Sequence, residues 1–169
     1  MHEKLPHISL EHHYQFITFR TYKSIDSYIQ RVQQAEIETK KKEYLIDEYL
    51  DTSSKGAYFF GEQIMLMKDI LYSKNHTLYT IEICAIMPNH IHILLQQHAS
   101  LEKIVKYIKG RSAIEMNKKL NLKGQFWHRN YFDKLIRNEK HFNLVYEYIQ
   151  NNPLKAHLKD AKRVFSAYE

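Results

Sequence analysis

The sequence is poor in the residues that interrupt or cross-link a chain. Its 169 residues include four glycines, three prolines and one cysteine, and the glycines and prolines do not cluster. Since no composition shift marks a linker, we expect a single domain over residues 1–169. A lone cysteine excludes an intrachain disulfide and is consistent with a reducing compartment. Cys84 lies among isoleucines, which indicates a small buried hydrophobe.

Long apolar runs are also missing. No stretch reaches the roughly 20 residues that a membrane-spanning helix needs. The first residues, Met-His-Glu-Lys-Leu-Pro, contain no apolar core of signal-peptide length. The sequence therefore predicts a cytoplasmic protein that has no membrane partner.

Acidic residues are fewer than basic ones, 19 against 25, which gives a formal net charge of +6. A basic chain is typical of nucleic-acid binding proteins. Net charge bears on association rather than on fold, so a solvated basic surface with no special partner stays open. The 13 tyrosines suit stacking on the bases of single strands, and they suit core packing with a polar tip equally well.

The order of hydrophobic patterns predicts an α+β fold. Asp26, Ser100 and Asn138 are placed to cap helices, and Pro153 to end the last one. Two neighbouring strands form a hairpin at Pro88, and helices separate the others, so we expect a ferredoxin-like antiparallel sheet with helices on one face. Expected strands cover residues 14–22, 77–87, 90–95 and 125–136, and expected helices cover 27–50, 61–72, 101–120 and 138–153. A tail follows, which we expect to pack in part through Leu158, Val164 and Phe165.

Two histidines are two positions apart in the third expected strand. Because side chains alternate along a strand, His90 and His92 project from one face with their backbones roughly 6–7 Å apart, and the two rings can converge on one metal ion. Ile91, Ile93 and Leu95 then point to the opposite face, where a core would lie. Such pairs also occur as ordinary surface histidines, and the chain has 11 histidines. The pair by itself leaves both interpretations open.

The last expected helix carries two tyrosine–amide pairs beside an apolar stripe that faces the core. Tyr148 is aligned with Asn152 one turn later, and Tyr146 is aligned with Gln150 on the other flank. Helix geometry does not choose between the pairs, and two amphipathic tyrosines at the edge of a core would give the same pattern.

These groups are the components of a phosphoryl-transfer site. A tyrosine hydroxyl has an ordinary pKa of about 10 and is a weak nucleophile while protonated. Attack on a phosphodiester therefore requires a cation that withdraws charge from the phosphate. Two imidazoles and an amide oxygen would leave coordination positions free for phosphate oxygens. Such a site suits Mn²⁺, or Mg²⁺ where phosphate oxygens complete the shell.

A known family shows the same motifs in the same order. Met87-Pro-Asn-His-Ile-His-Ile-Leu-Leu resembles the His-hydrophobe-His (HUH) signature of single-tyrosine transposases, especially the REP-associated tyrosine transposases. The resemblance covers about residues 14–158 and includes Phe16-Ile-Thr-Phe-Arg, Tyr49-Leu-Asp followed by Gly56, Lys106-Tyr-Ile-Lys-Gly-Arg-Ser-Ala, Gly124-Gln-Phe-Trp-His-Arg-Asn-Tyr-Phe-Asp-Lys-Leu-Ile-Arg-Asn-Glu and Tyr148-Ile-Gln-Asn-Asn-Pro-Leu-Lys-Ala.

This resemblance implies an HUH nuclease fold and a transposase that cuts single-stranded DNA through a covalent 5′-phosphotyrosine intermediate. It implies that Tyr148, on a C-terminal helix, is the nucleophile. It also implies that His90, His92 and Asn152 hold a divalent metal ion. Related transposases carry a glutamine four residues after the tyrosine, so the second tyrosine–amide pair of the helix stays as a minority alternative.

The resemblance further implies single-stranded or hairpin DNA as the partner. Some relatives exchange the tyrosine helix between subunits, which leaves a homodimer open. Phosphate contacts would hold the strand without specifying its sequence. The expected DNA contacts are Lys106, Lys109, Arg111, Trp127 and Arg129.

Two other functions stay open. A hairpin DNA- or RNA-binding protein that does not cleave would bind in a salt-sensitive, metal-independent way and form no adduct. A metallohydrolase would use the histidine pair to activate water and would cleave without a covalent intermediate. The motifs offer it no clear additional carboxylate.

Overall fold

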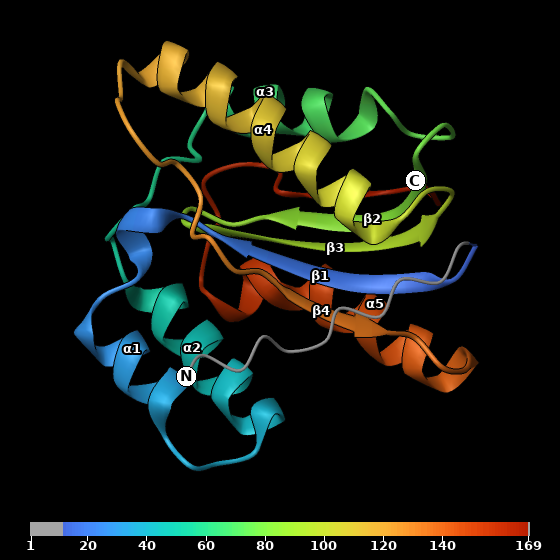
Figure 1. The fold of residues 1–169 in the computed structure, drawn as a ribbon, viewed down its shortest axis with the longest axis horizontal. Coiled ribbons are helices and arrows are strands. Elements are labelled where there is room, and N and C mark those ends of the chain that lie inside the picture. Colours follow the sequence, from blue (N-terminus) through green and yellow to red (C-terminus); the bar gives the residue numbers. More distant parts are fainter. Residues whose placement is uncertain (1–11, 169) are drawn as a thin grey trace.

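The described part of the computed structural model, residues 12–168, contains one sheet of five strands in the order β4-β1-β3-β2-β5, drawn in Figure 1. Every strand pairing in it is antiparallel. The elements are β1 (Tyr14–Arg20), a 3-10 turn η1 (Tyr22–Ser24), α1 (Ser27–Gln34), α2 (Thr39–Thr52), α3 (Glu62–Tyr72), β2 (Tyr79–Ile86), β3 (His90–Gln97), α4 (Leu101–Leu120), β4 (Phe132–Leu135), α5 (Glu139–Lys155) and β5 (Val164–Ser166). The predicted α+β fold with an antiparallel sheet is confirmed. The opening residues, on which the expected absence of a signal peptide rests, lie outside the described residues.

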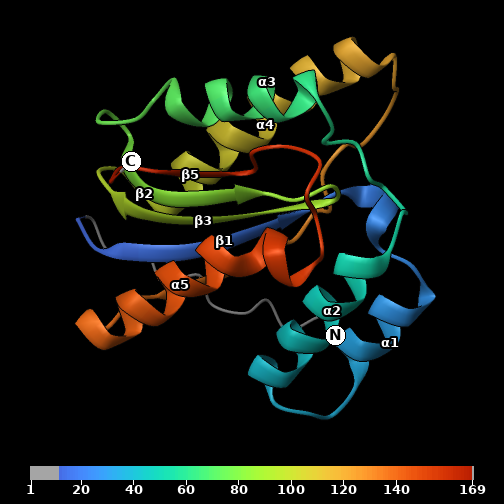
Figure 2. The same ribbon diagram turned by 180° about the vertical axis from the view of Figure 1, so that it is seen from behind.

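Helices cover both faces of the sheet, and the expectation that they lie on one face was wrong. α3 and α4 lie over one face, and α5 lies over the other, with α1 and α2 beside it (Figures 1 and 2). The reason lies in the central strands. Ile91, Ile93 and Leu95 pack under α3 and α4, while Leu94 and Ile83 belong to the apolar cluster under α5. A strand that is apolar on both faces needs cover on both.

The charged stretch that was expected to form one helix, residues 27–50, folds as two. α1 and α2 are separated by residues 35–38, and Asp26 caps α1 as predicted. The turn allows Ile29 and Val32 on α1 to pack against Ile46 and Leu50 on α2 in a cluster of their own. In one continuous helix the two apolar stripes could not face each other.

The C-terminal third departs from the expected pattern in two places. Of the expected strand over residues 125–136, only β4 forms. Phe126 and Trp127 are consecutive and both pack into the core cluster under α3 and α4, whereas alternation in a strand would send them to opposite faces. Pro153 does not end α5, which continues to Lys155. A proline so close to the C-terminus removes one backbone hydrogen bond from the last turn of the helix and leaves the rest of it intact.

Other terminal features agree with the expectation. Ser100 caps α4 and Asn138 caps α5. The tail packs as expected through Phe165, which is buried, but residues 164–166 also add the fifth strand, β5, beside β2. A strand of three residues is too short to show alternation in a sequence. Among the described residues, no helix has the length and apolarity to cross a bilayer.

Candidate metal centre

His90 and His92 lie on β3 with both rings on the face of the sheet that α5 covers. Both side chains are 0% exposed, and their ring centroids are 4.9 Å apart. Ile91, between them, points into the core under α3 and α4. The alternation that the sequence predicted for this strand is confirmed, and the two imidazoles are next to each other.

Each histidine is oriented by a hydrogen bond at its Nδ1 atom. His90 Nδ1 lies 2.7 Å from the side-chain oxygen of Asn89, and His92 Nδ1 lies 2.8 Å from the hydroxyl of Thr18. An amide oxygen only accepts, so His90 Nδ1 carries the hydrogen and leaves Nε2 with a lone pair. The Nε2 atoms of both rings are buried and have no hydrogen-bond partner among the described residues. Because a buried polar atom without a partner costs free energy, these two nitrogens fit a bound metal ion, and their outer hydrogen bonds are of the kind that orients histidine ligands.

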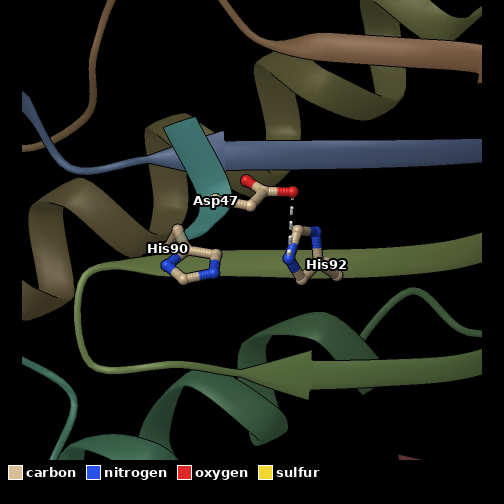
Figure 3. A group of neighbouring side chains, drawn as sticks. All are labelled: Asp47, His90 and His92. Atoms are coloured by element: carbon tan, nitrogen blue, oxygen red, sulfur yellow. Dashed lines mark ion pairs between the residues drawn. The ribbon is translucent and has the colours of Figure 1, made fainter. Parts of the chain in front are cut away.

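A carboxylate from α2 completes the group, and the sequence analysis missed it. Asp47 Oδ2 lies 3.9 Å from His92 Nε2, and the ligand atoms of Asp47, His90 and His92 all lie within 4.8 Å of one another. Figure 3 shows Asp47 reaching from α2 toward the two rings. One turn further along α2, Asp51 Oδ1 lies 3.9 Å from His90 Nε2.

The sequence does contain a signal for these acids. Glu43, Asp47 and Asp51 recur every four residues, which places them on one face of a helix. That stretch is heavily charged throughout, which is ordinarily typical of a solvent-exposed helix. Asp47 is instead 7% exposed.

The surroundings set the charges of His90, His92 and Asp47. Burial lowers the pKa of His92 to about 4, against the attraction of Asp47, and burial together with His92 holds the pKa of His90 well below its ordinary value. Both rings are therefore neutral at pH 7, as metal ligands must be. Burial alone would raise the pKa of Asp47, but His92 and Arg20 outweigh it, so this pKa is lowered and the carboxylate is ionised.

Tyr148 and Asn152 on α5 lie at the same centre. The Tyr148 hydroxyl donates to Asp47 Oδ2 at 2.6 Å, and its ring lies edge-on to His92, 5.3 Å between centroids. Burial, then the negative charge of Asp47, raises the pKa of Tyr148, while the nearby Asn152 amide acts in the opposite direction. Asn152 is 1% exposed, and neither atom of its amide has a close hydrogen-bond partner among the described residues.

The alternative tyrosine–amide pair points elsewhere. The Tyr146 hydroxyl is hydrogen-bonded to Ser166 on β5, and Gln150 is exposed. The structure therefore brings Tyr148, and not Tyr146, to the histidine pair.

Two of the expected DNA contacts on α4 are separated from this centre by the sheet. α4 lies with α3 over the opposite face (Figure 2). Lys106 is exposed there, and Arg111 pairs with Glu115 one turn away at 3.1 Å. The structure brings neither cation to the histidine pair.

The remaining expected DNA contacts lie on or against the loop before β4. Trp127 is 4% exposed and donates to Ser112 Oγ at 2.8 Å, so its ring packs in the core, and its contact with DNA stays a prediction. Lys109 donates to the carbonyl oxygens of His128 and Arg129, at 2.7 and 3.2 Å, and holds the loop instead of standing free for phosphate. Arg129 itself is exposed.

A family model for IS200-like transposases matches residues 61–152, more than half of the chain. The chain belongs to this family. The match includes the histidine pair, Tyr148 and Asn152, whereas β1, α1 and α2 lie before it. The part of the transposase that supplies Asp47 is therefore outside the family match.

Three individual proteins resemble the chain to different extents. A REP-associated tyrosine transposase, solved bound to a REP hairpin, superposes with a TM-score of 0.56 at 13% identity, over 90% of this chain and 73% of that one. A protein of Deinococcus radiodurans R1 superposes at 17% identity with a TM-score of 0.49, over 90% of this chain and 98% of its own. An uncharacterised protein of Haemophilus influenzae is 57% identical over 28 residues, which is 17% of this chain and only 16% of that protein. The HUH fold expected from the sequence is confirmed by the REP-associated enzyme.

Proposed function

We propose that this transposase is a metal-dependent endonuclease and strand transferase for single-stranded DNA, with Tyr148 as its nucleophile. One observation supports the proposal above all. The Tyr148 hydroxyl donates to the Asp47 carboxylate, which also faces the histidine pair. The proposed nucleophile and the candidate metal site therefore share this carboxylate.

The residues that would hold the metal are His90, His92 and Asp47, with Asn152 as the further ligand that the sequence suggests. Their two neutral imidazoles, ionised carboxylate and amide suit Mn²⁺ or Mg²⁺. A bound ion would withdraw charge from a phosphate and orient it. The buried Nε2 atoms that lack partners support this assignment.

The tyrosine step exchanges one phosphorus–oxygen bond for another, so the phosphate remains a diester. The phenolic oxygen of Tyr148 forms a bond to phosphorus, the bond from phosphorus to the 3′-oxygen breaks, and the 3′-oxygen leaves as a hydroxyl. Tyr148 loses one proton and the departing 3′-oxygen gains one, so no net proton is produced. Asp47 Oδ2 already accepts the hydrogen bond of the phenolic proton. The reverse attack by another 3′-hydroxyl rejoins strands without an external energy source.

The proposed partner is single-stranded DNA with a hairpin. It is supported by the net charge of +6 and by a fold neighbour solved with a REP hairpin. Since Tyr148 and the histidine pair of one chain lie together, the proposal requires no second subunit, and a homodimer stays an expectation. The proposal includes a cytoplasmic location, which the lone cysteine supports.

The test is covalent capture of DNA. Purified protein, incubated with a labelled single-stranded hairpin and Mn²⁺ or Mg²⁺, should form an adduct that survives denaturing electrophoresis. Tyr148→Phe should abolish the adduct, and Tyr146→Phe, the matched control on the same helix, should retain it. An adduct that persists in Tyr148→Phe contradicts the assignment.

Two outcomes would indicate the other functions. Salt-sensitive binding with neither metal dependence nor adduct would indicate a non-cleaving hairpin-binding protein. Cleavage without an adduct would indicate a metallohydrolase, to which Asp47 offers the carboxylate that the motifs lacked.

A further inference from the structure

Arg20, the last residue of β1, is a buried cation at the back of the proposed site. It is 6% exposed and contacts two acids on α2 through one atom, Nη2. One contact is a close hydrogen bond to Glu43 Oε2. The other reaches Asp47 Oδ1 at 3.4 Å.

The two oxygens of Asp47 are thereby divided between two neighbours. Oδ1 faces Arg20, and Oδ2 accepts from the Tyr148 hydroxyl at 2.6 Å. The contacts from Arg20 to Asp47 and from Asp47 to Tyr148 connect β1, α2 and α5, and Asp47 also lies beside His92. We infer that Arg20 is a positioning residue for the nucleophile, because it orients the carboxylate that holds the Tyr148 hydroxyl. This inference rests on the proposed function of Tyr148.

The location of α2 explains why Asp47 needs a contact that positions it. α2 is outside the sheet, and its apolar side chains pack mainly against α1. That packing does not fix the position of Asp47 relative to α5. A reactive hydroxyl such as that of Tyr148 has to be held within a fraction of an ångström. Arg20 enters from β1, where its backbone pairs with His90, so it ties the carboxylate to the strand that carries the histidines.

Arginine suits this task better than lysine. Both contacts come from Nη2, whose two N–H groups are held at a fixed angle by the planar guanidinium, whereas an ammonium rotates on a flexible stem. Glu43, one turn before Asp47 on α2, is the second acid that holds the guanidinium.

A purely structural role for Arg20, as an anchor of α2, is the competing explanation. A second contact between α1 and α2 serves as a control, because it involves none of the proposed site residues. Tyr49 donates to Asp26 Oδ2, and this bond ties α2 to the start of α1. Tyr49→Phe removes this hydrogen bond but keeps the aromatic ring against the apolar cluster of α1 and α2, and it changes no contact between Arg20, Asp47 and Tyr148.

The first measurement is the rate of adduct formation at saturating hairpin DNA and Mn²⁺, with folding verified by circular dichroism. Arg20→Lys should lower this rate by roughly 10- to 100-fold, as expected for a misplaced reacting group, with the half-saturating DNA concentration almost unchanged. Asp47→Asn should lower it similarly. The double variant should be no slower than the slower single variant, because Arg20 acts through Asp47. Tyr49→Phe should stay near the parent rate.

The second measurement needs neither metal nor DNA. With Tyr148→3-fluorotyrosine, the ¹⁹F NMR signal reports the hydrogen bond of that phenol. Asp47→Asn and Arg20→Lys should both move it, Arg20→Lys should not move it further when Asp47→Asn is present, and Tyr49→Phe should leave it in place. If Arg20→Lys fails to fold, Glu43→Gln, which loosens the same guanidinium, should give a smaller shift in the same direction.

The inference would be overturned by additive rate losses in the double variant. It would also be overturned by a fluorine chemical shift that stays unchanged in both Arg20→Lys and Glu43→Gln. The two proposals fail differently. If the parent protein forms no adduct, the proposed function fails, whereas the fluorine measurement still decides whether Arg20 positions Tyr148.

Discussion

At the residue scale, Asp51 is a buried acid whose Oδ1 atom has no hydrogen-bond partner among the described residues. Burial, and then the charge of Asp47, raises its pKa to about 7. An ordinary aspartate titrates near 4 in the unfolded chain, so the folded protein binds a proton at Asp51 that the unfolded chain has already released. Stability is therefore lost as the pH rises from about 4 through 7.

Asp51→Asn should remove this cost. In metal-free protein, we expect the variant to unfold at a higher temperature than the parent at pH 8, by roughly 1–2 kcal/mol or about 2–6 °C. The gain should fade toward pH 4, where the parent carboxyl is protonated in both states. Thermal unfolding over this pH range measures it, and equal midpoints for parent and variant at pH 8 would show that Asp51 carries no electrostatic cost.

Prediction at this scale succeeded where a residue obeys a local period. His90 and His92 share a face because side chains in a strand alternate, and the sequence contains that information. The choice between Tyr148 and Tyr146 could not come from the helix, since both flank the same stripe. It follows from what faces each hydroxyl, which is Asp47 for one and Ser166 for the other.

At the element scale, α2 is the segment that joins a separate apolar cluster to the metal centre. Its inner face packs on α1 through Ile46 and Leu50, and its acidic residues meet the histidines. The stability of this small cluster should therefore set how well the carboxylates are held.

The division of residues 27–50 into two helices was not predicted, because a continuous periodic pattern does not reveal a chain reversal. The break at residues 35–38 is decided by the contact between the two apolar stripes.

Leu50→Ala tests this dependence. Loss of a buried leucine costs about 2–5 kcal/mol, and we expect it to raise hydrogen exchange in α1 and α2 while β3 stays protected. Mn²⁺ affinity, measured by calorimetry, should fall severalfold. Met67→Ala, in the core under α3 and α4, is the matched control and should lose stability without losing Mn²⁺ affinity. The same Mn²⁺ affinity in both variants would show that the apolar cluster of α1 and α2 does not hold the carboxylates in place.

At the scale of the whole molecule, the exposed cations that were expected to contact DNA lie in two separate places. Lys106 and Arg111 lie with α4 on the face away from the histidines. Arg129 follows His128, whose backbone N–H donates to the Arg20 carbonyl oxygen at 2.7 Å, at the end of the sheet where β3 begins. Of these cations, Arg129 is the one placed to meet a strand that approaches the site.

Salt dependence measures such contacts. Hairpin DNA affinity should fall linearly with salt on a logarithmic scale, since bound phosphates release counterions. Arg129→Gln should reduce the slope by about one. Lys106→Gln, which removes one charge from the opposite face, should leave it unchanged. A slope that responds to Lys106→Gln instead would place the DNA on α4.

The sequence by itself determined the α+β class, the antiparallel hairpin, the paired histidines and the family, because periodicity and motif order are local properties that survive without coordinates. Tertiary structure alone decided which tyrosine meets the histidines, that Trp127 is buried, and that Asp47 enters the site from a helix outside the family match. Those outcomes depend on contacts between residues far apart in the chain. Asp47 and Tyr148 are 101 positions apart in the chain, and only the tertiary arrangement of α2 beside α5 brings their oxygens to 2.6 Å.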